Sequence, residues 1–191
     1  PSKGALKSLR GRSFYLEILM EQVLDELLSK LCLSRVNLIY SGGGHFYILA
    51  PNTESIDKQL RSFQDHVNTW LLQQFGTQLY IAFGSASASA NDLMASSSQR
   101  NIFRQVSKSV NDAKLNRYSK ENLAKLFDSD SEYNALVDGE RECSICHAST
   151  KNLLSYGDDT DTYACETCTN LFKLGKQIVD HEDSVFVLAI P

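Results

Sequence analysis

Residues 41–52 read Ser-Gly-Gly-Gly-His-Phe-Tyr-Ile-Leu-Ala-Pro-Asn, and this run decides the fold that the sequence predicts. Mostly apolar residues at 36–40 and again at 46–50 predict two buried β-strands, the second ended by Pro51. The glycine triplet between them predicts a tight hairpin. Because glycine has no Cβ, the backbone of such a turn can adopt left-handed angles, and a ligand can reach its N–H groups directly. A simple turn without a ligand is the alternative.

On both sides of the hairpin the apolar spacing is helical, and an extended pattern returns further along the chain. Residues three and four apart predict amphipathic helices, the first with Ser13 as its N-cap and the second with Gly76 at its C-cap. Cys32, on the apolar side of the first helix, is predicted to be buried. The expected elements are helices over 13–32, 54–75, 102–115 and 120–127 and a third strand over 79–87. This order predicts an α+β fold, an antiparallel sheet with helices on one face, which we assign to residues 1–131.

Composition and charge exclude several classes of protein. With 42% hydrophobic and 22% charged residues in 191, the chain falls in the range of folded proteins rather than disordered ones. Its longest apolar runs are far shorter than the roughly 18 residues that cross a bilayer, so we expect no membrane partner and a cytoplasmic location. The net charge of −4 argues against general affinity for nucleic acid.

Any contact with an anion would therefore need a local basic patch. The first candidate is the group Lys3, Lys7, Arg10 and Arg12, where Gly11 predicts a short turn that could present arginines to phosphate or carboxylate. Two further groups of basic residues lie at 100–120 and at Lys173 and Lys176. An ordinary solvated helix face is the alternative for these two.

Four of the five cysteines form two pairs with the spacing of a zinc site. They are Cys143, Cys146, Cys165 and Cys168. Two residues between ligands allow one tight turn to aim both sulfurs at the same ion, and two such pairs complete a tetrahedral site. Disulfides are the alternative, but nothing in the sequence indicates a secreted protein. We expect structural zinc in residues 132–191, with His147 a neighbour rather than a ligand, and a helix over 170–179 and a strand over 184–190 behind it.

The hairpin in its setting resembles the palm domain of GGDEF-type nucleotide-polymerising and cyclising enzymes, which implies a ferredoxin-like fold. Gly42-Gly43 and Phe46 match the family's hairpin, but Gly44-His45 stand where the two metal-binding acids should be. The run 112–118, Asp-Ala-Lys-Leu-Asn-Arg-Tyr, resembles a second GGDEF stretch whose lysine meets triphosphate. The resemblance therefore implies a palm that could hold a nucleotide, with Lys114 as a phosphate candidate, but that is silent in catalysis alone. A basic residue at a helix C-terminus also complements the helix dipole, which is the alternative for Lys114.

Taken with Leu9-Arg10-Gly11-Arg12-Ser13-Phe14 and the four-cysteine module, these motifs closely resemble the large, polymerase-like subunit of type III-A (Csm) CRISPR effector complexes. The resemblance covers nearly the whole chain and implies a segment of a longer protein. In that family an HD domain cuts single-stranded DNA, and a second palm with a Gly-Gly-Asp-Asp motif makes cyclic oligoadenylates from ATP. Neither the His-Asp dipeptide nor Gly-Gly-Asp-Asp occurs in this sequence.

The resemblance also implies a site and partners. Residues Ser41, Gly42, Gly43 and Gly44 would approach ATP, with His45 at the pocket edge and Mg²⁺ held by the second palm. The expected partners are the other Csm subunits, with guide and target RNA reached through the complex. The alternative is a zinc-ribbon adaptor that binds nucleic acid or protein and uses the hairpin only as a turn.

Overall fold

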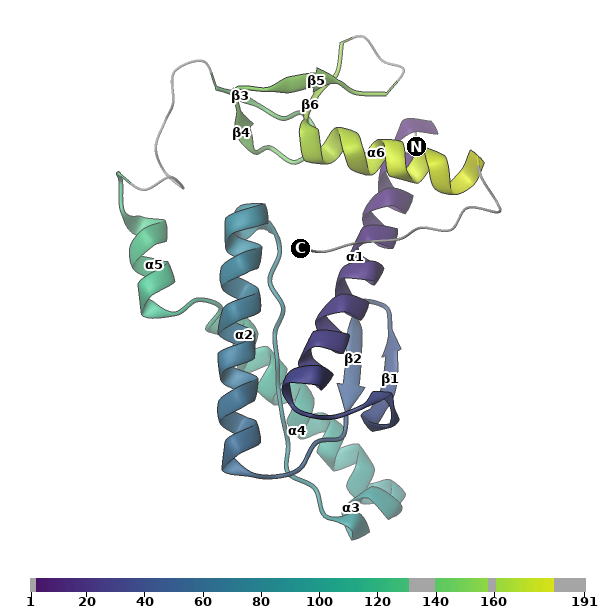
Figure 1. Ribbon diagram of the computed structural model, residues 1–191, viewed down its shortest axis with the longest axis vertical. Helices are drawn as coiled ribbons and strands as arrows, with labels where there is room; N and C mark the ends of the chain where they lie inside the picture. The colour runs from purple at the N-terminus through teal and green to yellow at the C-terminus, as the bar shows by residue number, and fades with distance from the viewer. Residues whose placement is uncertain (1–2, 131–139, 158–160, 181–191) are drawn as a thin grey trace. The chain divides into compact units, whose positions relative to one another are not determined.

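The structure, a computed structural model, describes residues 3–130, 140–157 and 161–180 (Figure 1). The chain forms two compact units. Unit 1 comprises Pro1–Leu24, Tyr40–Tyr47 and Leu136–Pro191, and unit 2 comprises Asp25–Ile39 and Ile48–Ala135. The first helix and the hairpin contribute residues to both units. The strand expected at 184–190 lies outside the described residues.

Helices dominate, and the strands form small sheets. The helices are α1 (Lys3–Lys30), α2 (Glu54–Phe75), α3 (Ala90–Met94), α4 (Ser96–Leu115), α5 (Lys120–Phe127) and α6 (Glu166–Asp180). The strands are β1 (Leu38–Gly42), β2 (His45–Ile48), β3 (Arg141–Glu142), β4 (Ser149–Thr150), β5 (Leu153–Ser155) and β6 (Tyr163–Cys165). They pair as β1-β2, β3-β4 and β5-β6, the last two pairs antiparallel. This mixture of helices and small antiparallel sheets confirms the predicted α+β class. Of the helices described, none is apolar enough over sufficient length to span a membrane.

Helix α1 begins ten residues before the predicted start, so Ser13 is not an N-cap and Gly11 does not form a turn. Gly11 is buried inside the helix, where a Cβ would lie 1.9 Å from the carbonyl oxygen of Leu171. The glycine is therefore needed for close backbone packing against α6 rather than for a turn. Glycine commonly marks a turn, which is why the sequence pattern was misleading here.

The end of α1 also corrects a prediction, because Cys32 is exposed rather than buried. Its φ of +54° places it in the left-handed position that follows a helix end. The N–H of Cys32 donates to the carbonyl of Ser29 at 3.0 Å, and that of Leu33 donates to Leu28 at 2.8 Å, the paired bonds of a Schellman motif. The predicted buried strand at 36–40 starts at Leu38 instead, since Val36 lies in a 3₁₀ turn and is 94% exposed.

The third strand predicted at 79–87 is not formed. Asn68, a buried residue of α2, takes the place of a neighbouring strand: its Nδ2 donates to the carbonyl of Ile81 at 2.9 Å, and its Oδ1 accepts from the Ile81 N–H at 2.9 Å. Further along, Gly84 passes so close to α4 that a Cβ would lie 2.5 Å from the backbone nitrogen of Val110. The segment is thus held by a side chain and by helix packing rather than by a sheet.

Unit 2 has its apolar core on two helices. The buried apolar residues here are Leu27, Leu28 and Leu31 at the end of α1 and Phe63, Val67, Leu71 and Leu72 of α2. Helix α2 matches its predicted bounds, with the Thr53 hydroxyl accepting from the N–H of Ile56 at 3.3 Å and Gly76 at the C-cap. Phe63 meets Phe83 edge to face, with ring centroids 5.9 Å apart. This contact holds the segment after α2 against the core.

Candidate nucleotide and metal sites

The glycine hairpin forms as predicted and exposes its tip. Gly42, Gly43 and Gly44 have φ values of +155°, +61° and +76°, which residues with a Cβ rarely adopt. Gly43, Gly44 and His45 are exposed, and a Cβ built on Gly44 would meet nothing within 4 Å. The backbone of this turn is therefore open to a ligand.

Side chains beside the turn add two features. The Ser41 hydroxyl donates to Glu21 Oε1 of α1 at 2.9 Å, so the side chain of Ser41 points to the helix and its oxygen retains acceptor capacity. On the hairpin itself, Tyr40, His45 and Tyr47 form a ring cluster with centroids 5.3 to 6.4 Å apart. Nothing in the spacing of the sequence pointed to Glu21, which acts on the hairpin from twenty residues away.

The hairpin carries no carboxylate, because residues 40–48 contain neither Asp nor Glu. Two adjacent acids are what a palm hairpin uses to grip a divalent cation, and a glycine and an imidazole cannot replace these hard oxygen ligands for Mg²⁺. The nearby carboxylate of Glu21 accepts from Ser41. The turn can thus present N–H groups to phosphate oxygens but lacks a metal-binding pair of its own.

Lys114 belongs to unit 2, whereas hairpin residues 40–47 belong to unit 1. It is exposed in the last turn of α4, and its carbonyl accepts from the Nε of Arg117 at 3.3 Å. The guanidinium of Arg117 lies 5.9 Å from the ring centroid of Tyr80. The role of Lys114 as a phosphate contact remains a prediction.

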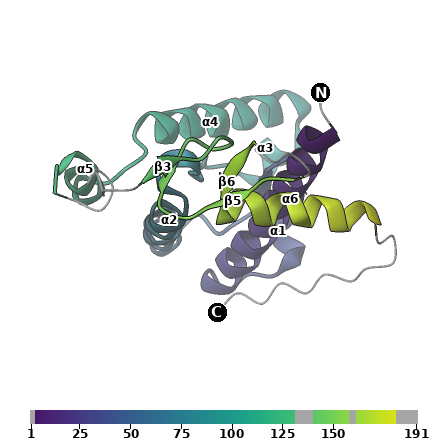
Figure 2. The same cartoon turned by 90° about the horizontal axis from the view of Figure 1, so that it is seen from above.

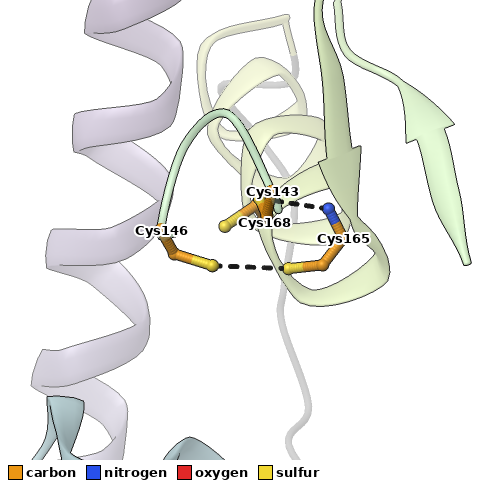
Figure 3. Close-up of side chains that lie close together, drawn as sticks. All are labelled: Cys143, Cys146, Cys165 and Cys168. Atoms are coloured by element: carbon orange, nitrogen blue, oxygen red, sulfur yellow. Dashed lines mark hydrogen bonds between the residues drawn. The ribbon is translucent and has the colours of Figure 1, made fainter. Parts of the chain in front are cut away.

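The four cysteines of the two pairs converge on one point (Figure 3). All four Sγ atoms lie within 4.8 Å of one another, and those of Cys146 and Cys165 are 3.7 Å apart. All five cysteines are free of disulfides. Four sulfurs at metal–sulfur distances of about 2.3 Å in a tetrahedron are separated by about 3.8 Å, so the cluster could hold one metal ion.

The backbone around the cluster positions the sulfurs. Cys143 and Cys146 lie on the turn between β3 and β4, Cys165 ends β6, and Cys168 is in the first turn of α6. The N–H groups of Ile145 and Cys165 donate to Cys143 Sγ at 3.4 and 3.2 Å. Burial alone would raise the pKa of Cys143, but hydrogen bonds from the backbone of Cys165, Cys146 and Ile145 and from the Cys146 side chain lower it to about 6. Burial, followed by the neighbouring thiols, raises the pKa of Cys168.

Packing behind the cysteines makes the module one small core. Tyr156 and Phe172 pack with ring centroids 4.9 Å apart, and Ala164 is fully buried beside them. His147 is exposed, and its Nδ1 contacts Glu142 rather than the four sulfurs. Arg12 Nη2 of α1 donates to Cys168 Sγ at 3.3 Å. No sequence pattern indicates this contact, since 156 positions separate the two residues.

Comparison with known proteins gives concordant matches. The model of a family described as Csm1 subunit domain B matches residues 1–129. The type III-A CRISPR single-strand-specific deoxyribonuclease Cas10/Csm1 of Mycobacterium tuberculosis is 44% identical over 189 residues, covering 93% of this chain and 22% of that protein. The Streptococcus thermophilus protein of the same description is 39% identical over 185 residues, covering 94% of this chain and 23% of that protein.

A solved structure matches as well. A crystal structure of a Csm1-Csm4 cassette in complex with one ATP has a TM-score of 0.54 and 33% identity, covering 59% of this chain and 16% of that one. The chain spans about a fifth of the length of the curated relatives it matches.

Proposed function

This chain belongs to the Csm1 family, through the domain described as Csm1 subunit domain B. We propose that it is part of the large subunit of a type III-A CRISPR effector complex. Residues 1–131 would supply the non-catalytic first palm of that subunit, and residues 132–191 its metal module. The family model's match to residues 1–129 supports this division. Its partners would be the other Csm subunits, and guide and target RNA would act on it through the complex. A relative solved as a Csm1-Csm4 cassette with ATP supports the choice of partners.

Within that subunit, the hairpin would form one wall of an ATP pocket. The observation that carries this proposal is a turn of three glycines at positive φ, Gly42, Gly43 and Gly44, of which Gly43 and Gly44 are exposed. Its N–H groups would donate to phosphate oxygens. The Ser41 hydroxyl donates to Glu21, so its oxygen would be left to accept from a donor of the nucleotide, such as a ribose hydroxyl, rather than to contact phosphate. His45 would close the edge of the pocket.

The chemistry would take place on the partner palm. Because residues 40–48 contain no acid, the hairpin would bind and orient the nucleotide while the second palm's carboxylates hold the metal. Those carboxylates would hold Mg²⁺, which would supply positive charge to the phosphates for attack of a ribose hydroxyl on an α-phosphate. This palm alone would therefore be inactive in synthesis of cyclic oligoadenylate.

A calorimetric titration of ATP with Mg²⁺ into the full-length subunit tests the pocket. We expect Gly43→Asp to weaken ATP binding at least tenfold, because the new carboxylate strains the turn and repels phosphate. Gly76→Asp is the matched control, since Gly76 has a similar φ of +57°, has nothing within 4 Å of a built Cβ and lies outside the hairpin, as the C-cap of α2. Unchanged binding in Gly43→Asp would contradict the pocket and favour the zinc-ribbon adaptor.

We propose that the four-cysteine cluster holds structural zinc. Four thiolates close the coordination shell of a tetrahedral ion, which leaves no place for a reacting water. Cys143, Cys146, Cys165 and Cys168 would be its ligands, joining the turn after β3 to the start of α6. Native mass spectrometry should find one zinc per chain, and a folded chain without metal would contradict this assignment.

A further inference from the structure

Helices α1 and α6 cross with their backbones in contact, and both Figure 1 and Figure 2 show the two helices side by side. The contact depends on two buried glycines. A Cβ on Gly11 would lie 1.9 Å from the Leu171 carbonyl oxygen, and a Cβ on Gly175 would lie 1.8 Å from the Lys7 carbonyl oxygen. We call this contact the α1–α6 crossing. Neither position can accept a side chain without displacing a helix, so the close approach of the two backbones requires a glycine on each helix.

The face of α6 that makes the crossing is the face that carries a metal ligand. Cys168, Leu171 and Gly175 are spaced three and four apart, which aligns them along one side of the helix. Arg12 follows Gly11 directly on α1, and its Nη2 reaches Cys168 Sγ at 3.3 Å. The crossing thus brings a guanidinium to a sulfur of the four-cysteine cluster.

The negative charge of the proposed zinc centre explains how the contact between Arg12 and Cys168 could stabilise it. A divalent ion with four thiolates carries a net charge of −2, in a site where Cys143 and Cys168 are almost completely buried. A guanidinium is permanently charged and weakly hydrated, so it can neutralise part of that charge at low desolvation cost. Hydrogen bonds to metal ligands of this kind alter metal affinity by about 10- to 100-fold.

We propose that Arg12 donates a hydrogen bond to a cysteine ligand of the metal centre, Cys168, and that this bond couples metal binding to the α1–α6 crossing. The proposal rests on the zinc site proposed above. Lys7 supports it: one turn before Gly11, its Nζ lies 5.7 Å from the ring centroid of Phe172, which is part of the module's core. The basic cluster at the start of the chain therefore serves the metal module through these two residues, whereas Arg10 is exposed.

Competition for zinc between the full-length protein and a chromogenic chelator tests the proposal. Arg12→Met keeps much of the side-chain length and removes the charge, and we expect it to weaken zinc binding 10- to 100-fold. Arg12→Lys should lose less because it keeps the charge. Arg10→Met, on the same helix and exposed, is the control and should bind zinc as the unmodified protein does.

A spectroscopic measurement shows whether Arg12 acts on the metal centre through its hydrogen bond to Cys168 or only stabilises the fold. With Co²⁺ in place of zinc, loss of a hydrogen bond to Cys168 Sγ should shift the sulfur-to-cobalt charge-transfer band in Arg12→Met but not in Arg10→Met. Equal zinc affinity and an unshifted band in Arg12→Met would overturn the proposal. If Arg12→Met does not fold, Arg12→Gln, which also removes the charge, takes its place in the same two measurements, and equal zinc affinity with an unshifted band in Arg12→Gln would overturn the proposal. An unmodified protein that binds no zinc would instead refute the zinc site itself.

Discussion

Asn68 stabilises the segment after α2 by hydrogen bonding to both polar backbone groups of Ile81. Replacing it with Ala leaves that N–H and carbonyl without their partners, and each such group costs about 1–3 kcal/mol when it is shielded from water. We expect Asn68→Ala to lower the free energy of unfolding by about 2–3 kcal/mol, measured by urea denaturation. Gln73→Ala, exposed on the same helix, should change it by less than about 0.5 kcal/mol.

The residues that the sequence predicted correctly are those whose chemistry is local. The four cysteines are brought together by two short turns, so their spacing was enough to place them in one cluster. The contacts of Glu21, Asn68 and Arg12 join residues 13 to 156 positions apart, and no periodicity encodes them. Cys32 was predicted to be buried because the helical pattern runs past the true helix end, where a left-handed residue turns it outward.

At the α1–α6 crossing, replacing glycine with alanine should destabilise the protein, although the same change usually stabilises a helix. Ala in place of Gly normally stabilises a helix interior by about 1 kcal/mol. At Gly11 the added methyl would lie 1.9 Å from a carbonyl oxygen, so the helices must move apart. We therefore expect Gly11→Ala to lower the free energy of unfolding of the metal-loaded protein by about 2 kcal/mol or more. Calorimetric unfolding measures this.

Ser13→Ala is the control for this experiment, since Ser13 is exposed on α1 and its replacement adds no steric conflict. We expect it to be neutral or slightly stabilising. A stabilising effect of Gly11→Ala would show that the backbones of α1 and α6 do not touch as described.

Among the elements, those with strong amphipathic spacing and clear end signals were predicted best. Helices α2 and α5 match their predicted bounds, because a capping residue or a glycine marks the ends of the apolar pattern. Helix α1 was predicted too short because Gly11 resembles a turn until its packing partner, 160 positions later, is known. The alternation at 79–87 was interpreted as a strand, but an extended segment becomes a strand only if a neighbour pairs with it, and the side chain of Asn68 occupies that role at Ile81.

At the level of the whole chain, the four-cysteine module and the first turns of α1 belong to one compact unit, while α2 and α4 belong to the other. The sequence predicted a boundary near residue 131 because acidic and small residues separate the palm pattern from the cysteines. It could not predict that the start of the chain joins the cysteine module, since this depends on the crossing at Gly11 and Gly175. The two units should therefore respond differently to the metal.

Removing the metal tests this division. If zinc holds Cys168 and Arg12 together, a chelator should increase amide hydrogen exchange in residues 140–157, in α6 and in residues 3–12 of α1. Helices α2 and α4 should keep their protection, because none of their residues belongs to unit 1. Faster exchange confined to 140–180 would contradict the coupling to α1, and loss of protection in α2 as well would contradict the independence of the two units. Readdition of zinc should restore the original pattern, since a ligand that binds only the folded form stabilises it by an amount that rises with the logarithm of the free ligand concentration above its Kd.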